Sequence, residues 1–264
     1  MKLSTKILSL ALALVMLVCA ISLTSCNGAD HPAADNEKIK IGLTGPLTGG
    51  ASIYGIAVKN AAQLAIDEIN AAGGLDGIQF ELVMYDDKHD ATTVETLYAK
   101  LYEEGMQASL GTVTTKPGLE FKELSKADNV FVLTPSASGD DIPEFDNGFQ
   151  MCFADGNQGK VAAEFVNANF AGQTIGAFYK SDEAYSKGIF EQFKANLDAS
   201  VTVVETNFTD ANTTDFQTQI DTLKACEFIF MPTYYQPASL FMKQAKDKLA
   251  ADTVYYGCDG FDGI

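Results

Sequence analysis

Small and hydroxyl-bearing residues gather in two loops of the first half of the chain, each directly after a predicted strand. One loop holds Thr114 and Thr115, and the other holds Ser136, Ala137 and Ser138. Hydroxyl groups, together with free backbone N–H groups at the start of a helix, can bind a carboxylate without a charged partner. Since the sequence contains no arginine, a bidentate guanidinium clamp is excluded. We therefore expect any anionic group to be held by hydroxyls and amides.

Tyrosines and one aspartate occupy other loops that follow predicted strands. Tyr54 opens a helix after the first strand, Tyr185 and Tyr234 lie in the second half, and Asp259 lies near the end of the sequence. A carboxylate can hold an ammonium group, and tyrosine rings can enclose an apolar side chain. This inventory suits a zwitterion with a modest side chain. The structural alternatives are helix caps for the hydroxyls, packing for the tyrosines, and a glycine-flanked turn for Asp259.

Groups that catalyse reactions are scarce, because the chain has only two histidines. His31 belongs to the N-terminal region, and His89 lies in the acidic segment 86–90. That segment lacks EF-hand spacing and a second histidine, so we interpret it as a turn after a strand, with Asp90 as a helix cap. The sequence contains no G-x-S-x-G nucleophile elbow, and its glycine-rich first loop does not match a nucleotide-binding fingerprint. The sequence predicts a protein that is not an enzyme and that uses neither a metal nor a cofactor.

The N-terminus has the pattern of a lipoprotein signal peptide over residues 1–25. Two lysines precede an apolar run, and Leu23-Thr24-Ser25-Cys26 resembles a bacterial lipobox. We expect cleavage before Cys26 and acyl chains on that cysteine, which would anchor an extracytoplasmic protein to the cell membrane, in the periplasm or on the outer face. An ordinary signal peptide with an incidental cysteine is the alternative. Residues 26–37 are short and polar, and we interpret them as a tether.

Charge and length narrow the possible classes further. The net charge of −17 at pH 7 argues against a nucleic-acid partner. Without residues 1–25 the chain is still longer than one ordinary domain and suits two lobes. Cys152, Cys226 and Cys258 lie far apart and allow at most one disulfide, so we interpret each as a small apolar side chain.

Strand-like and helix-like segments alternate from residue 38 onward. Strands are predicted at residues 38–43, 80–85, 108–110, 130–133, 174–179, 201–206, 227–231 and 253–256. Helices are predicted at residues 54–72, 91–104, 119–126, 158–169, 186–197, 216–224 and 238–249. Strands separated by helices of this length indicate crossover connections and parallel sheets.

The longest polar break of the chain, residues 140–155, has four predicted strands on each side. The sequence therefore predicts an α/β fold of two doubly wound Rossmann-like lobes, 38–152 and 153–258, joined by a hinge near residues 149–153. We expect residues 259–264 to begin a return crossover to the first lobe. Because nothing in the sequence follows to cover the last strand, we expect the chain to be truncated at its C-terminus.

Several segments, in this order and spacing, resemble the branched-chain amino acid substrate-binding family of ABC importers. They begin with Ile39-Lys-Ile-Gly-Leu-Thr-Gly-Pro-Leu-Thr-Gly49 and continue at residues 54–55, 67–74, 85–87, 133–138, 155–159 and 257–263. The resemblance implies the type I periplasmic-binding fold and a lipoprotein form of a solute-binding protein. One departure is Lys116-Pro117, which stands where a serine-rich stretch is more typical of the family.

The resemblance also implies roles for individual residues. Thr114, Thr115 and Ser138 match positions that bind a carboxylate, and the Ser136 backbone matches a group that touches the polar head of the ligand. Asp259 matches the acidic residue that binds an α-ammonium. The aromatic positions that close over the ligand match Tyr54, Tyr185 and Tyr234. Ala137 belongs to the same predicted ligand-binding loop.

The expected partners follow from this family. They are an amino acid, with Leu, Ile or Val favoured, and the permease and ATPase subunits of an ABC importer. We expect a monomer that reaches the membrane through its lipid anchor. Alternatives are the ligand-sensing module of a signalling system, a binder of another small amide or carboxylate, and a secreted hydrolase, which the missing nucleophile and base disfavour.

Overall fold

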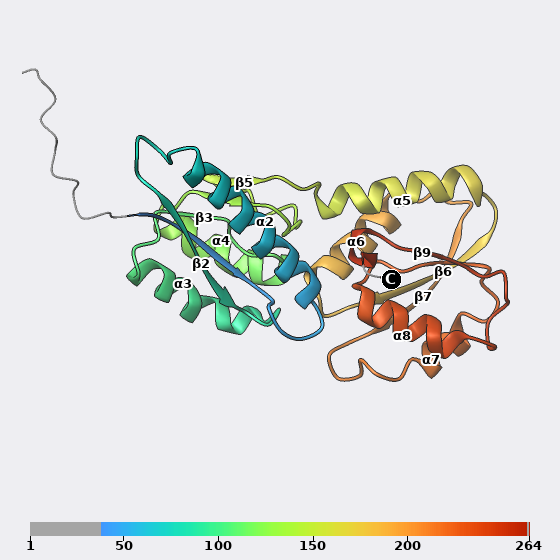
Figure 1. The fold of residues 1–264 in the computed structure, drawn as a ribbon. Helices are drawn as coiled ribbons and strands as arrows, with labels where there is room; N and C mark the ends of the chain where they lie inside the picture. The colour runs from blue at the N-terminus through green and yellow to red at the C-terminus, as the bar shows by residue number, and fades with distance from the viewer. Residues whose placement is uncertain (1–37, 263) are drawn as a thin grey trace, which may run out of the picture. The chain divides into compact units, whose positions relative to one another are not determined.

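The computed structural model describes residues 38–262 and residue 264. The predicted signal peptide, the lipobox cysteine Cys26 and the tether 26–37 lie outside the described residues. Residues 39–264 form one compact unit, in which two parallel sheets are each covered by helices (Figure 1). Among the described residues, every helix is too short or too polar to cross a bilayer.

The first lobe is built on a five-stranded parallel sheet with the order β2-β1-β3-β4-β5. Its strands are β1 (Ile39–Gly45), β2 (Phe80–Asp86), β3 (Ala108–Ser109), β4 (Val132–Thr134) and β5 (Gly148–Gln150). Its helices are α2 (Ser52–Ala71), α3 (Val94–Glu103) and α4 (Thr115–Ala127), with one 3-10 turn, η2 (Ala91–Thr93), before α3.

The second lobe is built on a four-stranded parallel sheet with the order β7-β6-β8-β9. Its strands are β6 (Thr174–Lys180), β7 (Thr202–Phe208), β8 (Phe228–Phe230) and β9 (Val254–Tyr256). Its helices are α5 (Asp155–Asn169), α6 (Ala184–Ala195), α7 (Gln217–Thr222) and α8 (Tyr235–Ala245), and a 3-10 turn, η3 (Asp259–Phe261), follows β9.

Side-chain alternation explains the two cores of the second lobe. Successive residues of a strand point to opposite faces of the sheet. Phe228 and Phe230 of β8 therefore join a cluster with α5 and α6, whereas Ile229 joins a separate cluster with α7 and α8. Because both faces are covered, the strand is apolar throughout, as is typical of a parallel sheet.

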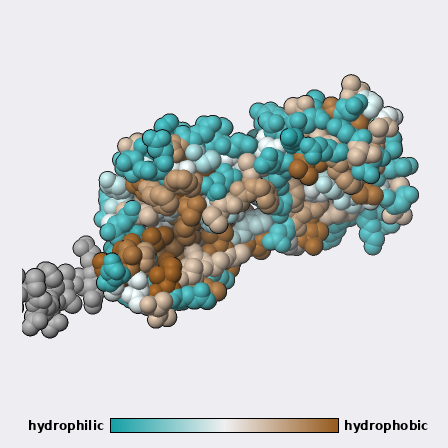
Figure 2. All heavy atoms as spheres, turned by 90° about the horizontal axis from the view of Figure 1, so that it is seen from above, coloured by the Kyte–Doolittle hydropathy of each residue, from teal (hydrophilic) through white to brown (hydrophobic). Residues whose placement is uncertain are grey.

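The first lobe is less completely covered. The core formed with α3 and α4 includes buried Leu101 and Phe121. By contrast, α2 buries only Gly55 and Ile66, and it leaves apolar side chains such as Leu64 exposed to solvent. Figure 2 shows hydrophobic residues gathered on the face of the first lobe that is seen from above. Helix α2 therefore has apolar residues both on its buried face and on its exposed face, and its composition alone does not show which face is buried.

The predicted fold class and the four strands on each side of residues 140–155 are confirmed, but one strand inside that stretch was missed. Gly148–Gln150 forms a fifth strand that pairs in parallel with β4, inside the stretch interpreted as a polar break. Three residues are too few to show a two-residue period, so only the pairing with β4 reveals this strand. The chain then passes into the second lobe at residues 151–154.

Three helices begin three or four residues before their predicted starts. The prediction places them at residues 119, 158 and 238, whereas α4, α5 and α8 begin at Thr115, Asp155 and Tyr235. Pro117 and Pro237 lie in first turns, where proline is tolerated because its missing N–H would have no intrahelical acceptor. The earlier starts bring these helix N-termini close to the ends of the strands. The remaining boundaries agree within about two residues, except that α8 ends earlier than predicted and that α3 begins at Val94, after the 3-10 turn η2.

Candidate functional site

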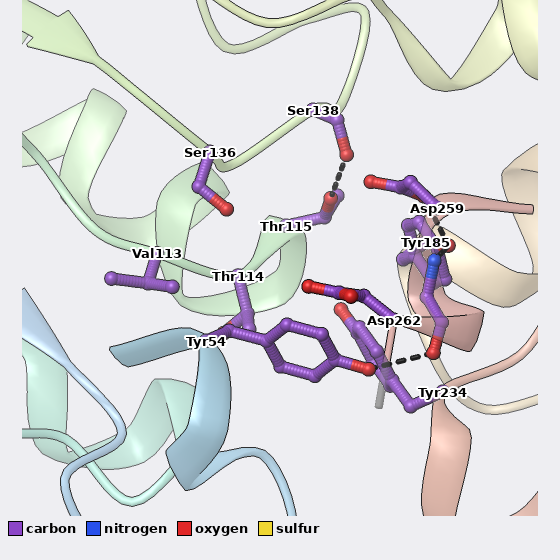
Figure 3. A pocket seen from close by; sticks show the side chains of 11 residues that line it. Tyr54, Val113, Thr114, Thr115, Ser136, Ser138, Tyr185, Tyr234, Asp259 and Asp262 are labelled. Atoms are coloured by element: carbon purple, nitrogen blue, oxygen red, sulfur yellow. Dashed lines mark hydrogen bonds between the residues drawn. The ribbon is translucent and has the colours of Figure 1, made fainter. Parts of the chain in front are cut away.

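A cavity of about 400 Å³ lies between the loops of the two lobes, within the range typical of small-molecule sites. Figure 3 shows side chains from both lobes pointing into it. The residues that line it are Tyr54, Val113, Thr114, Thr115, Ser136, Ser138, Tyr185, Tyr234, Asp259, Gly260 and Asp262. Most of them come from segments that directly follow the C-terminal ends of strands, whereas Asp262 follows the 3-10 turn η3.

The strand order explains why the cavity lies here. In doubly wound sheets, ligands bind beyond the carboxyl ends of the strands, where the direction of strand addition reverses. In the first lobe this point lies between β1 and β3, and the segments after these strands supply Tyr54 and Thr114. In the second lobe it lies between β6 and β8, which are followed by Tyr185 and Tyr234. The cavity thus occupies the switch points of both sheets.

The first lobe contributes hydroxyls around one buried carboxylate. The side chain of Thr115 donates a hydrogen bond from Oγ1 to Oδ2 of Asp155 over 3.2 Å, and it lies 3.4 Å from Oγ of Ser138. The backbone N–H of Asp155 donates to the Ser138 carbonyl over 2.8 Å. Burial, reinforced by the charge of Asp259, raises the pKa of Asp155 to about 7. Asp155 is therefore partly protonated at neutral pH.

The second lobe contributes a carboxylate held in place by Tyr185. The Tyr185 hydroxyl donates to Oδ1 of Asp259 over 2.5 Å and accepts from the backbone N–H of Gly260 over 2.8 Å. A Cβ at Gly260 would lie 2.6 Å from that hydroxyl, so only glycine permits this close approach. The backbone N–H of Asp259 also donates to Gln158 on α5 over 3.1 Å. The Asp259 carboxylate thus has a fixed direction beside the cavity.

Two tyrosines join the lobes across the cavity. Tyr54, near the start of α2, donates a hydrogen bond from its hydroxyl to the Gly260 carbonyl over 2.6 Å. The ring of Tyr234 stacks on Tyr185, with centroids 4.6 Å apart, and lies 5.6 Å from the ring of Tyr54. Burial raises the pKa of Tyr54, so its hydroxyl keeps its proton and remains a donor. The rings form an apolar wall in which the hydroxyls of Tyr54 and Tyr185 are held by hydrogen bonds.

The N-terminus of α4 provides donors on the opposite side. Thr114 is the N-cap residue, yet its side chain makes no capping hydrogen bond, and Pro117 at the third helical position has no N–H. The first N–H groups of a helix have no acceptor within it, and they carry the positive end of the helix dipole. The backbone N–H groups of Thr115 and Lys116 therefore favour an anion.

Eight of the nine residues predicted to bind a ligand line this one cavity. Ala137 does not, because its side chain is buried and its N–H donates to Oγ1 of Thr134 over 3.1 Å. Sequence reasoning missed Val113, Gly260 and Asp262 as lining residues, and it missed the role of Asp155 behind Thr115. An aspartate three residues before a predicted helix was the available signal for Asp155, but a residue at that place is more typical of a helix cap than of a binding site.

The interpretation of the segment 86–90 is confirmed as a turn. Asp90 is the N-cap of η2 and accepts a hydrogen bond from the Thr92 N–H over 2.9 Å. Within the part of the chain that the structure describes, His, Cys, Asp and Glu side chains form no group of three suited to a metal ion. Cys152, Cys226 and Cys258 have free thiols.

The lining groups suggest what the cavity binds. Its side chains offer two carboxylates, Asp259 and Asp262, and several hydroxyls. No lysine is among the lining residues, so no lysine there would compete with a cationic ligand group for the two carboxylates. A positive group is favoured near the carboxylates, and a negative group is favoured at the N-terminus of α4. The arrangement suits a small molecule with charges of opposite sign at one end.

Comparison with known proteins agrees with this geometry. A sequence model for a family described as periplasmic binding proteins matches residues 38–262. The chain is 31% identical over 230 residues to the Leu/Ile/Val-binding protein BraC3 of Rhizobium johnstonii, covering 85% of this chain and 62% of that protein. It is 30% identical over 231 residues to the leucine-, isoleucine-, valine-, threonine- and alanine-binding protein of Pseudomonas aeruginosa, covering 85% of this chain and 61% of that protein.

A solved structure is similar over the same region. It is the branched-chain amino acid transporter substrate-binding protein LivJ of Streptococcus pneumoniae in complex with isoleucine, with a TM-score of 0.78 and 30% identity. The match covers 85% of this chain and 65% of LivJ. The chain therefore spans less than two thirds of the length of these relatives.

Proposed function

The chain belongs to the periplasmic binding protein family, and from this premise we propose that it is the solute-binding component of an ABC importer that captures a branched-chain amino acid. The fold is of the type I periplasmic-binding class. The relatives named above bind Leu, Ile and Val according to their names, with threonine and alanine added for one of them, or are bound to isoleucine, and this supports a branched-chain ligand.

One observation carries the proposal. A single cavity has an uncapped helix N-terminus with hydroxyls on one side and the oriented carboxylate of Asp259 on the other. An α-amino acid carries a carboxylate and an ammonium on the same carbon, so both groups find partners at once. The tyrosine wall formed by Tyr54, Tyr185 and Tyr234 then suits an apolar side chain.

In this proposal capture occurs by movement of the two lobes about the hinge. We place the lobes at residues 38–152 and 153–258, with the hinge where the chain leaves β5 for α5. The ligand is held first by the hydroxyl loops, and Tyr185 and Tyr234 complete the enclosure as the lobes approach. The ligand is bound and released without covalent change. Permease and ATPase subunits, a monomeric state and a lipid anchor at Cys26 complete the proposed importer.

The test is calorimetry and thermal unfolding of the full protein with leucine, isoleucine and valine. We expect at least one of them to bind and to raise the unfolding temperature, since a ligand at 100 times its Kd stabilises the folded state by about 2.7 kcal/mol. Isoleucinamide lacks the carboxylate and 3-methylvaleric acid lacks the ammonium. Each should bind at least about tenfold more weakly, because each loses a charge-assisted hydrogen bond.

Other outcomes would redirect the assignment. If another small amide or carboxylate stabilises the protein while no branched-chain amino acid does, the ligand class is wrong. If isoleucine binds but cells that lack the gene take up labelled isoleucine normally, the protein is a ligand-sensing module and not part of an importer.

A further inference from the structure

His89 lies beside the cavity, outside the set of predicted ligand-binding residues. It follows β2 in the first lobe, and its Nδ1 lies 2.9 Å from Oγ1 of Thr114. Its ring meets the ring of Tyr234 in the second lobe edge-on, with centroids 5.2 Å apart and planes at 85°. His89 therefore contacts one cavity-lining residue from each lobe.

The backbone of the turn fixes where this ring sits. His89 has a φ of 62° and Lys88 has a φ of 56°, in the left-handed region that residues with a Cβ rarely adopt. The His89 N–H donates over 2.9 Å to Oδ1 of Asp87, a side chain that is fully buried. A buried acceptor and an unusual backbone conformation together hold the imidazole against Thr114.

The contact with His89 accounts for the missing cap of α4. A threonine at the N-cap normally uses its side-chain oxygen to accept a hydrogen bond from a first-turn N–H. The Thr114 side chain makes no such bond, because its Oγ1 is within hydrogen-bond distance of His89 instead. The first N–H groups of α4 are thereby left available at the cavity.

We propose that His89 is a positioning residue for the carboxylate of the ligand: its neutral ring, with the proton on Nδ1, donates to Oγ1 of Thr114, so that the Thr114 hydroxyl offers its own proton to the cavity. A threonine hydroxyl has a single proton to donate. If that proton went to His89, Thr114 would present only lone pairs, which attract an ammonium and repel a carboxylate. The role of His89 rests on the proposed amino-acid function, which supplies the carboxylate.

The surroundings of the ring favour the neutral form that this role needs. Burial, followed by the positive charges of Lys180 on β6 and Lys116 on α4, lowers the pKa of His89 to about 4. The carboxylates of Asp210, after β7, and of Asp90, on the same turn, act in the opposite direction and are outweighed. Above about pH 5 the ring is therefore neutral, and one of its nitrogens carries the proton.

The first test is NMR of the histidine ring nitrogens, and it needs no ligand. Because the sequence has only two histidines, His31 serves as an internal reference in the full protein. At pH 7 we expect His89 in the Nδ1–H form. Thr114→Val removes the hydroxyl and keeps the shape, so it should shift the signals of His89 but not those of His31. The proposal would be overturned if the wild-type ring carried its proton on Nε2, or if the His89 signals did not change in Thr114→Val. Either result would hold even if no amino acid binds.

The second test measures isoleucine affinity in two matched variants. Asparagine and aspartate have the same shape and both tolerate a positive φ, but only asparagine can donate a hydrogen bond to Thr114. We expect His89→Asn to stay within about threefold of the wild type and His89→Asp to bind about tenfold more weakly, as for loss of one hydrogen bond to a charged group. Thermal unfolding of each variant checks that it is folded.

A cycle with Thr114→Val separates positioning from simple repulsion by the new charge. If His89 acts through the Thr114 hydroxyl, the difference between His89→Asn and His89→Asp disappears in the Thr114→Val background. If the affinity difference between His89→Asn and His89→Asp persists in the Thr114→Val background, it comes from repulsion between the new aspartate and the ligand carboxylate, and the positioning role is rejected. If the wild type binds no branched-chain amino acid, the proposed function fails, and the NMR result still decides whether His89 donates to Thr114.

Discussion

The two lobes share a strand order at their centres but present opposite chemistry at the ends of their strands. In each sheet the first strand of the lobe, β1 or β6, lies between the next two strands along the chain. The first lobe uses this position for hydroxyls and a helix N-terminus, through Thr114 and Thr115. The second lobe uses the equivalent position for the aromatic rings of Tyr185 and Tyr234, and the turn that carries Asp259 follows the neighbouring edge strand β9.

This difference teaches that topology decides where a site forms, and that the loop residues decide what it binds. The switch point supplies hydroxyl and amide donors in the first lobe and tyrosine rings in the second. Asp155 links the two sets, because it begins the first helix of the second lobe yet accepts a hydrogen bond from Thr115 of the first. Substitutions that change the binding groups of one lobe at a time therefore test whether the two lobes have these different roles.

The largest effect is expected from the carboxylate of the second lobe. Asp259→Ala should weaken isoleucine binding about 100- to 1,000-fold, because removing one partner of a hydrogen-bonded charge pair costs about 2 to 5 kcal/mol. Asp262→Ala is the matched control, since this carboxylate also lines the cavity but is not the one that Tyr185 orients. Calorimetry on both variants decides the matter, and equal losses would contradict a special role for Asp259.

The next effect concerns the pH dependence of stability, through Asp155. Its pKa of about 7 in the folded protein exceeds that of an unfolded aspartate, so the folded state holds an extra proton between about pH 4 and pH 7. The stability from this proton is present at low pH and is lost as the pH rises through 7. We expect a fall of about 2 kcal/mol in the free energy of unfolding between pH 5 and pH 8, and Asp155→Asn should remove it.

Denaturant titrations at several pH values measure this difference. Asp87→Asn is the control, because burial raises the pKa of Asp87 only to about 6. Its effect should be confined to lower pH than that of Asp155. Identical profiles for the wild type and Asp155→Asn would show that Asp155 does not titrate in this range.

A smaller effect on stability is expected from removing the Thr115 hydroxyl of the first lobe, which donates a hydrogen bond to Asp155. Thr115→Val removes the hydrogen bond to Asp155 and leaves a buried oxygen with one partner fewer. The free energy of unfolding should fall by about 1 to 2 kcal/mol, and the pKa of Asp155 should rise further. Thr92→Val is a suitable control, since its hydroxyl bonds to exposed Asp90 away from the cavity. A stability loss for Thr92→Val as large as that for Thr115→Val would contradict this account.

The smallest effect is expected for the hydrogen bond between the lobes. Tyr54→Phe removes the bond to the Gly260 carbonyl, together with a weak bond that the Tyr235 N–H donates over 3.4 Å, and keeps the ring. One neutral hydrogen bond contributes about 0.5 to 1.5 kcal/mol, so isoleucine affinity should fall about two- to tenfold. In Tyr235→Phe, the lost hydroxyl accepts from exposed Gln236, and affinity should not change. A similar loss in both variants would show that the link to Gly260 has no particular part in binding.

Much of the site could be predicted because its residues follow strands. Thr115, Ser138, Tyr185 and Asp259 each come after an apolar run, and the ends of parallel strands meet at one edge of a sheet. Asp262 could not be predicted in the same way, since it follows the 3-10 turn η3 and reaches the cavity only through the position of that turn.

Contacts between distant segments were also hidden from the sequence. Tyr54 and Gly260 are 206 residues apart, and nothing local indicates their hydrogen bond. The strand β5 was missed for the same reason, because a segment of three residues is recognised as a strand only by its pairing with β4. Ala137 shares a loop with two cavity-lining serines, yet the curve of that loop turns its side chain into the interior.

The sequence by itself determined the two-lobed parallel fold and the chemical inventory of the site. Alternating strands and helices leave few other topologies, and the absence of arginine excludes a bidentate guanidinium clamp on an anion. Only the tertiary structure decided how each group is used. The hydroxyl of Thr114 faces His89 and does not cap α4, because the direction of a hydroxyl depends on neighbours that folding brings from other parts of the chain.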